Sequence, residues 1–421
     1  YLIKPVNPNQ ILMAVKKILD NRRIQGEQAQ SAYMREFREL AVQLGVRLNA
    51  EEWSEVYRRL CHWHLTLGDS GDGGMLEILE NQHAEANHQF ARFIEDHYEH
   101  WMTGMEQGPV MSHQVLPTWL PDAVAGSEGR PLFLVVIDNL RWDQWRAIAP
   151  VLSDDWNIAE EKTYFSMLPT ATQYARNALF AGMTPADIAR TKPECWVDES
   201  AEGSKNAHEA KLQEALFERM GVKGKTAYHK ITSLEAGKRL ADRFHEQKGQ
   251  SVTTVVYNFV DMLSHARSEM EVIKELADDE AAYRSLTHSW FVHSPLKHML
   301  DAMAEMGGRV VLTTDHGTMR VDHPVEVRGD RATNANLRYK VGKNLGYNAE
   351  DVMEVKQPDK VGLPKPNVSS TYIFAKTRDF LVYPNNASRY VKTFRNSFQH
   401  GGVSMEEMII PWVVLDPKNT Q

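Results

Sequence analysis

The chain has 421 residues, too many for one ordinary hydrophobic core, so we expect two or three domains. Hydrophobic residues make up 42% and charged residues 25%, as in globular proteins, and no apolar run reaches the roughly 20 residues of a membrane helix. The net charge of −8 argues against a protein that coats nucleic acid. Two distant cysteines, Cys61 and Cys195, and no signal peptide predict a cytoplasmic protein without membrane insertion.

Residues 1–24 are typical of the end of a domain that begins upstream. The stretch YLIKPVNPNQILMAVKKIL opens inside an element, and Asn7 and Pro8 suit the start of a helix. Apolar residues then recur at helical spacing: Ile11, Leu12, Val15, Ile18 and Leu19. The alternative is an unrelated amphipathic helix.

Residues 25–129 predict a helical bundle followed by a linker. We expect helices at about 28–44 and 50–67, and a third with one apolar stripe formed by Phe90, Ile94, Tyr98 and Trp101. Cys61 and His64 lie three apart on one helix face, but no second Cys/His pair completes a structural zinc site. Residues 106–129, with Gly, Pro and Ser, are expected to form the linker.

From residue 130 to 421 the pattern is that of an α/β domain. Four short, continuous apolar runs predict strands buried on both faces, as in a parallel sheet covered by helices: PLFLVVID, SVTTVVYNFV, RVVLTTD and MIIPWVVLD. Helical stretches such as 207–219 and 233–247 lie between them. We expect insertions near 183–230 and 318–370 to roof the site.

Aspartates and histidines follow three of these predicted strands. Asp138, Asp261 and Asp315 stand at strand ends, with His265 and His316 close behind. Since sites in open α/β sheets form beyond the carboxyl ends of strands, these side chains should gather at one edge. Crowded carboxylates repel each other, and divalent cations such as zinc or manganese relieve that repulsion. Taken singly, each residue could instead be a helix cap or a turn residue.

Two further stretches could join this edge. Residues 168–182 place Pro-Thr-Ala-Thr at the start of a helix, where free N–H groups favour anions; a simple Thr cap is the alternative. His400 precedes two glycines, which allow close backbone approach, although an exposed loop histidine would look the same.

The order Asp, Pro-Thr-x-Thr, Asp-x-x-x-His, Asp-His-Gly and His-Gly-Gly resembles the alkaline phosphatase superfamily, over residues 130–417 and most closely its PglZ branch. The Lys4-Pro5 pair and following helix resemble the end of a receiver domain, whose phosphorylation site would lie outside this chain. The whole resembles PorX-type response regulators with a C-terminal PglZ domain. This implies an α/β fold with a mainly parallel sheet and helices on both faces, preceded by a three-helix bundle and the last strand and helix of a CheY-like receiver.

The resemblance also implies two metal ions, for which we expect Zn²⁺ in preference to Mn²⁺. One ion would take Asp261, His265 and His400, and the other Asp138, Asp315, His316 and the nucleophile oxygen. The nucleophile would be Thr172, as in nucleotide pyrophosphatase/phosphodiesterases, with Thr170 as the alternative. Three further side chains are weaker candidates for binding the substrate phosphate: Asn139, Arg176 and Asn177. His323 is a fourth candidate, and it would replace His400 as a metal ligand if that assignment fails.

The resemblance therefore predicts a two-component response regulator whose PglZ domain is a zinc-dependent phosphodiesterase, acting on oligonucleotides or cyclic nucleotides and linked to type IX secretion. Expected partners are a sensor histidine kinase, a sigma factor or secretion-system component, and a second copy in a phosphorylated homodimer. The alternative is a signalling or scaffold protein that keeps the metal site with little catalysis. A phosphomutase is a third interpretation, because the closing motif also resembles cofactor-independent phosphoglycerate mutases.

Overall fold

The structure is a computed structural model that describes residues 8–70, 73–199, 201, 203–258, 279–329 and 334–418. The chain divides into two compact units, residues 1–89 and residues 90–421. Within the described residues, no helix is long and apolar enough to cross a membrane. Each unit is described by itself.

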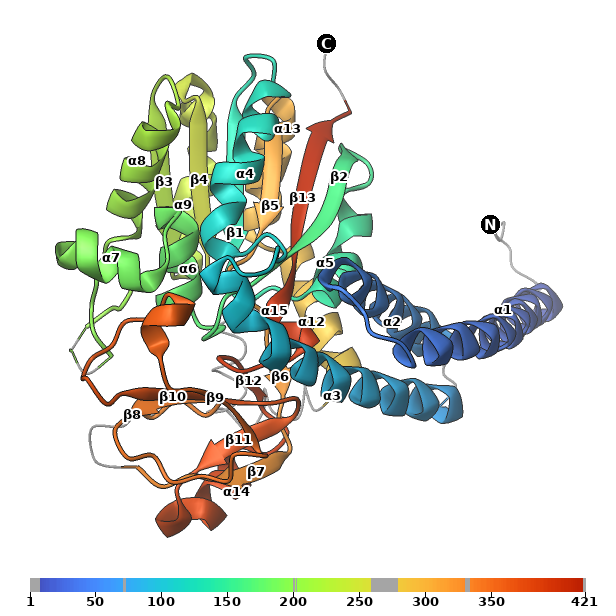
Figure 1. Ribbon diagram of the computed structural model, residues 1–421. Helices are drawn as coiled ribbons and strands as arrows, with labels where there is room; N and C mark the ends of the chain where they lie inside the picture. Colours follow the sequence, from blue (N-terminus) through green and yellow to red (C-terminus); the bar gives the residue numbers. More distant parts are fainter. Residues whose placement is uncertain are drawn as a thin grey trace. The chain divides into compact units, whose positions relative to one another are not determined.

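The first unit is built from long helices, as predicted (Figure 1). They are α1 (Pro8–Leu44), α2 (Ala50–Ser70) and the first part of α3 (Gly73–Thr103). The hydroxyl of buried Tyr33 donates to Gln82 Oε1 at 3.1 Å, joining α1 to α3. The helices expected near 8–22 and 28–44 are one continuous helix, and the strand expected before them lies outside the described residues.

The zinc site considered at Cys61 and His64 is not completed by the residues that the structure describes. Cys61 is buried, and His64 Nε2 lies 3.0 Å from His83 Nδ1 across α2 and α3. Among the described residues, no group of three metal-ligating side chains includes Cys61 or His64. Both residues therefore pack within the helical unit.

The second unit contains a six-stranded sheet of order β2-β13-β5-β1-β4-β3, in which β13 runs against its neighbours and the β5-β1-β4-β3 pairs are parallel (Figure 1). The strands are β1 (Leu132–Ile137), β2 (Trp156–Phe165), β3 (Thr226–Ile231), β4 (Val252–Tyr257), β5 (Arg309–Thr313) and β13 (Ile409–Pro417). The four predicted strands are confirmed. The two edge strands, β2 and β3, were not predicted because their exposed residues break up the apolar run.

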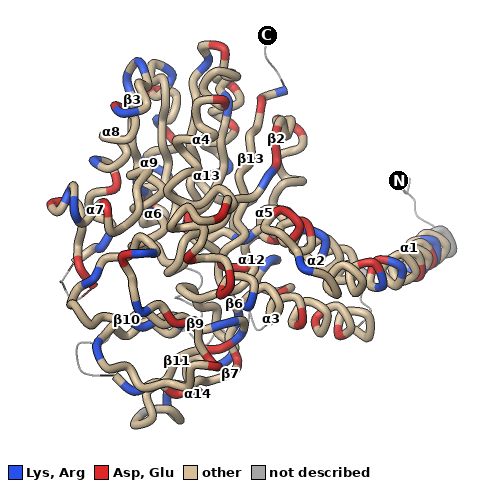
Figure 2. The backbone as a smooth tube through the Cα atoms, viewed as in Figure 1, with Lys and Arg blue, Asp and Glu red and all other residues tan. Residues whose placement is uncertain are grey.

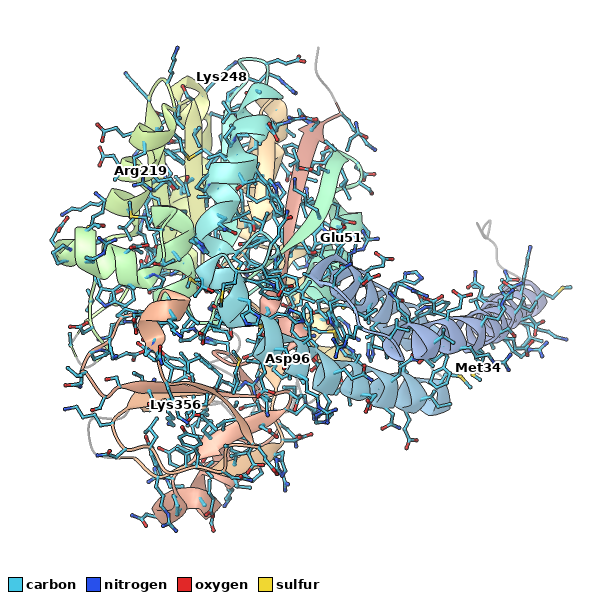
Figure 3. All side chains as sticks on the ribbon, in the orientation of Figure 1. Met34, Glu51, Asp96, Arg219, Lys248 and Lys356 are labelled. Carbon is cyan, nitrogen blue, oxygen red and sulfur yellow. The ribbon has the colours of Figure 1, made fainter. Side chains whose placement is uncertain are left out.

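Helices cover both faces of this sheet (Figure 1). On one face lie α4 (Ser112–Ala125), α6 (Thr172–Ala181) and α8 (Glu209–Met220). On the other lie α5 (Trp142–Ile148), α9 (Leu234–Asp242), α12 (Glu280–Val292) and α13 (Pro295–Glu305). Arg219 near the end of α8, labelled in Figure 3, donates to the Ala181 carbonyl of α6 at 2.5 Å. Shorter helices are α7 (Pro185–Thr191) and α15 (Met405–Met408).

Two expected boundaries need correction. Residues 106–129 are not only a linker, because they contain α4, whose Val115, Leu116 and Leu120 enter the core. Burial of this face outweighs the cost of two internal prolines. Residues 183–230 are not simply an insertion either, since α8 and edge strand β3 belong to the sheet layers.

The inserted region, defined here as residues 319–399, is longer than the expected 318–370. It contains three small sheets, β8-β10-β9, β11-β7 and β12-β6. Its elements are β6 (Met319–Arg320), β7 (His323–Glu326), β8 (Tyr339–Gly342), β9 (Val352–Val355), β10 (Thr371–Ala375), β11 (Asp379–Val382), α14 (Ala387–Phe394) and β12 (Phe398–Gln399). Acidic and basic residues are interspersed over it (Figure 2).

Candidate metal and catalytic centre

The parallel register of the central strands brings two aspartates together. Val136 of β1 pairs with Thr313 of β5, and Asp138 and Asp315 each follow two residues later. Both strands point the same way, so both carboxylates reach the same edge of the sheet. The exposed fractions of Asp138 and Asp315 are 1% and 0%, so water screens these charges poorly.

Local hydrogen bonds orient the Asp315-His316 pair. Asp315 Oδ1 accepts from the backbone amides of Asn139, at 3.3 Å, and His316, at 3.1 Å. His316 Nδ1 lies 3.0 Å from the Gly317 carbonyl and donates to it, which leaves the ring lone pair on Nε2. That Nε2 is 3.6 Å from Asp315 Oδ2 and 3.9 Å from Asp138 Oδ1.

These three side chains form the candidate metal cluster, which is defined by Asp138, Asp315 and His316. Their ligand atoms all lie within 4.8 Å of one another. Two carboxylates and an imidazole nitrogen suit zinc or manganese better than calcium or magnesium. The buried donor set therefore fits the transition metal that the sequence predicts.

Thr172 places a hydroxyl beside this cluster. It is the first residue of α6, after Ala171 in extended conformation. Its Oγ1 lies 3.1 Å from His316 Nε2 and 3.4 Å from Asp138 Oδ1. Thr172 as a residue is partly exposed, whereas the three residues of the cluster are buried. The helix start adds a favourable field for an anion.

Thr170, the alternative nucleophile, has a different environment. It is fully buried, and its Oγ1 donates to the Gly402 carbonyl at 2.9 Å and accepts from the Gly401 amide at 3.0 Å. The Leu168–Pro169 peptide before it is cis. The hydrogen bonds of Thr170 thus run to the His400-Gly401-Gly402 loop.

His400 is brought to the cluster from far along the chain. Its ring stacks on His316 with 4.4 Å between centroids and 20° between planes, and its Nδ1 lies 3.2 Å from the Thr170 carbonyl. Its expected partners in a second metal site, Asp261 and His265, lie outside the described residues. The structure therefore describes one of the three ligands expected for that site.

Arg176 enters the cluster as a buried cation. Its Nη1 lies 2.6 Å from Asp138 Oδ2 and 3.8 Å from Asp315 Oδ2, and its Nε donates to Glu209 at 2.7 Å. Burial lowers the pKa of this guanidinium, but the surrounding carboxylates outweigh burial and hold the pKa well above its ordinary value. Glu209 was not predicted; it starts α8 and has no sequence spacing that links it to Arg176.

The other expected substrate residues lie in three different environments. The backbone amide of Asn139 donates a hydrogen bond to the Asp315 carboxylate. Asn139 lies directly after β1 and has a positive φ of 67°. The side chain of Asn177 bonds to the carbonyls of Gln173 and Lys205 and accepts from Asn206, contacts that favour a structural role. His323 is exposed on β7 and lies 2.9 Å from Asp379, so the structure does not bring it into the cluster.

Several solved structures resemble the chain. Murine ectonucleotide pyrophosphatase/phosphodiesterase 5 aligns with a TM-score of 0.47 and 11% identity, covering 68% of this chain and 88% of that chain. The human protein of that name gives 0.47 and 10%, covering 68% and 87%. Phosphonoacetate hydrolase from Sinorhizobium meliloti 1021, in complex with phosphonoformate, gives 0.45 and 10%, covering 68% and 90%. No curated protein matches the sequence.

Two protein families match the sequence itself. Residues 23–102 match the PorX response regulator linker domain. Residues 117–415, more than half of the chain, match the BREX system PglZ alkaline phosphatase-like domain. Together the two matches support a phosphoesterase of response-regulator type. The chain belongs to the PglZ family of alkaline phosphatase-like domains, which it joins to a PorX-type response regulator linker.

Proposed function

We propose that the PglZ domain is a metal-dependent phosphodiesterase whose nucleophile is Thr172. The observation that carries this proposal is the position of Thr172 Oγ1, which lies 3.1 Å from His316 Nε2 and 3.4 Å from Asp138 Oδ1. A hydroxyl at a helix start, beside a buried cluster of metal-type donors, suits attack on phosphorus.

The residues of the chain divide the chemistry among them. Asp138, Asp315 and His316 hold a divalent cation, which when bound lowers the pKa of a neighbouring hydroxyl and neutralises phosphate charge. Thr172 Oγ1 gives its proton to water and attacks phosphorus, the ester bond opposite breaks, and the leaving alcohol takes a proton from water. Water then cleaves the phosphothreonine and releases a phosphate monoester.

A diester is the substrate class that the charges favour. The Arg176 cation is already paired with Asp138 and Glu209, so less positive charge remains for a dianionic monoester. The threonine nucleophile also resembles that of nucleotide pyrophosphatase/phosphodiesterases. We therefore propose oligonucleotides or cyclic nucleotides as substrates, with two Zn²⁺ ions as cofactors, the second bound by Asp261, His265 and His400.

The setting follows from the linker family. A response regulator linker suggests control by a sensor histidine kinase. We propose a cytoplasmic protein, consistent with its having only two cysteines, both buried, that dimerises on phosphorylation and acts on a sigma factor or component of type IX secretion. This wider setting depends on the resemblance to PorX-type regulators.

The test compares Thr172→Val with the parent chain, with metal content measured in both. Valine keeps the size and branching of threonine, so metal content and melting temperature should change little. Turnover of a chromogenic diester should fall by at least about 10³-fold, because the nucleophile is lost. Phosphate trapped on another residue after acid quench would contradict the assignment. A zinc-loaded parent that turns over no phosphate ester would favour the scaffold alternative.

A further inference from the structure

Thr170 and Thr172 are two residues apart, yet their hydroxyls have opposite surroundings. Thr172 is partly exposed and its Oγ1 lies beside the metal cluster, whereas Thr170 is buried and its Oγ1 is bonded to a distant loop. We propose that Thr170 is a positioning residue that fixes His400 for metal binding by clamping the His400-Gly401-Gly402 loop to the nucleophile loop. This inference rests on the proposed function for the role of the metal, and it assigns Thr170 no part in the bond-breaking step.

The clamp consists of two hydrogen bonds on one oxygen. Thr170 Oγ1 accepts the Gly401 N–H at 3.0 Å and donates to the Gly402 carbonyl at 2.9 Å. The hydroxyl therefore uses both its donor and its acceptor capacity on consecutive residues of one loop. This double contact fixes the position of the loop and its direction, since rotating the loop breaks at least one bond.

The far side of the same loop is closed by the inserted region. Gly401 has a φ of 120°, and a Cβ there would lie 2.5 Å from the Tyr339 ring. A Cβ on Gly402 would lie 2.5 Å from the Ala375 carbonyl and 2.7 Å from Arg338. The two glycines thus let the loop fit between the inserted region and Thr170. The loop therefore lies against the inserted region, and the Thr170 hydroxyl gives the same two glycines a further contact.

The Glu407 carboxylate holds the end of the loop. Its Oε1 accepts from the Gly402 amide at 2.9 Å, and its Oε2 accepts from the Ser404 hydroxyl at 2.7 Å. Arg338 binds the same carboxylate through two nitrogens. Thr170 and Glu407 therefore accept hydrogen bonds from two consecutive amides of the loop, those of Gly401 and Gly402.

The consequence reaches the imidazole of His400. Its Nδ1 lies 3.2 Å from the Thr170 carbonyl and donates to it, which puts the lone pair of a neutral ring on Nε2. The ring is held nearly parallel to His316. Hydrogen bonds of this kind set the tautomer and direction of histidine ligands, and losing them typically weakens metal binding about 10–100-fold. Thr170 thus supports His400 through its carbonyl and through its hydroxyl.

The experiment measures zinc affinity of the full chain by competition with a chromophoric chelator, together with melting temperature without metal. Thr170→Val keeps the carbonyl that His400 contacts and removes the hydroxyl that holds the loop, so it should weaken at least one zinc site about 10-fold, the low end of the range for loss of ligand support. Thr170→Ser keeps the hydroxyl and should restore affinity to within about threefold of the parent. Thr170→Ala provides the same test if valine prevents folding.

Thr287→Val is the matched control. Thr287 is also fully buried and also makes two hydrogen bonds, from Gln144 at 2.9 Å and to the Tyr283 carbonyl at 3.0 Å. Both valine variants should lower the metal-free melting temperature similarly, but the control should bind zinc as the parent does. Equal zinc loss in both variants, unchanged zinc binding in Thr170→Val, or failure of serine to rescue would each overturn the inference. A parent that binds zinc without diesterase activity would contradict the proposed function and leave this test intact.

Discussion

The six-stranded sheet and the inserted region hold their chains in place by different means. Strands β1 and β4 are buried along their whole length, between helices on both faces. In the inserted region the strands have two to five residues and many are partly exposed. There a fully buried ion pair, Arg338–Glu407, ties the region to the end of the chain. Apolar burial thus positions the sheet. The inserted region has smaller apolar clusters of its own, for example Val325 with Ile373 and Leu381, and adds the buried ion pair to them.

The two regions also position the side chains of the candidate site in different ways. Strand register brings Asp138, Asp315 and His316 to one edge of the sheet, and hydrogen bonds with neighbouring backbone groups orient Asp315 and His316 there. His400 follows the inserted region and reaches the same place through hydrogen bonds from Thr170 and Glu407 that hold its loop. The ligands from the sheet should therefore tolerate changes in the insertion, whereas His400 should not.

The largest effect is expected for Asp315→Asn, which removes a carboxylate that the sheet delivers. Diesterase activity should fall by about 10³-fold or more, with loss of bound zinc, since sites with few protein ligands need each one. In chelated protein the same change should leave stability equal or higher, because it removes repulsion between buried carboxylates.

Exposed Asp359 supplies the control, and Asp359→Asn should change neither quantity. His400→Ala should lower zinc content and activity together. The zinc should be lost only from the site that uses His400, and the other site should keep its ion. Full zinc content and activity in either ligand variant would rule that residue out as a metal ligand.

The second effect concerns the buried pair that holds the inserted region. Arg338→Met leaves the Glu407 charge buried without its guanidinium partner, since both side chains are 0% exposed. We expect a loss of about 3–5 kcal/mol in the free energy of unfolding, measured with urea. The double variant with Glu407→Leu should recover only part of this loss, because it removes the unpaired charge but leaves the Gly402 amide and the Ser404 hydroxyl without their acceptor. A single variant as stable as the double would mean that the pair does not hold the region.

The third effect tests the sheet unit through pH. Burial on α4 lowers the pKa of His113 to about 4, against an upward influence of Asp187. In the unfolded chain the pKa is about 6.5, so unfolding takes up a proton between these values and stability falls as pH drops through 6.5 toward 4. At pH 5 the loss should be about 2 kcal/mol.

His113→Gln should flatten this part of the stability–pH profile measured by chemical unfolding. His245→Gln, at an exposed histidine beside Glu305, serves as the comparison and should leave the slope as it is. An unchanged slope in His113→Gln would show that other groups cause the acid sensitivity.

The smallest effect is expected for Tyr98→Phe on α3. The buried Tyr98 hydroxyl accepts from the Leu168 amide at 2.8 Å, directly before the Pro169-Thr170 segment. Losing this bond should cost about 1 kcal/mol of stability. Hydrogen exchange at the Leu168 amide should become faster. The Tyr98→Phe variant should lower activity less than the Thr170→Val variant does. Slower exchange at Leu168 would contradict this role.

Predicting the fold from sequence succeeded where burial was continuous and failed where it was not. Runs such as PLFLVVID indicate strands covered on both sides, and β1, β4, β5 and β13 follow them. Edge strands β2 and β3 mix polar with apolar residues and gave no such signal. Helix α4 was not predicted because it contains two prolines, which are typical of loops. Its apolar face is stabilised by packing against α6, a contact that the sequence pattern does not show.

The sequence by itself determined that Asp138, Asp315 and His316 would meet, because parallel strands end at one edge and ligand types follow directly after them. The residues themselves did not separate Thr172 from Thr170, since both follow the same proline, and only the family resemblance ranked Thr172 first. Tertiary structure decided their environments by bringing a loop some 230 residues away onto Thr170. The partners Glu209 and Glu407 were likewise beyond sequence reasoning, because contacts between distant segments leave no periodicity in the chain.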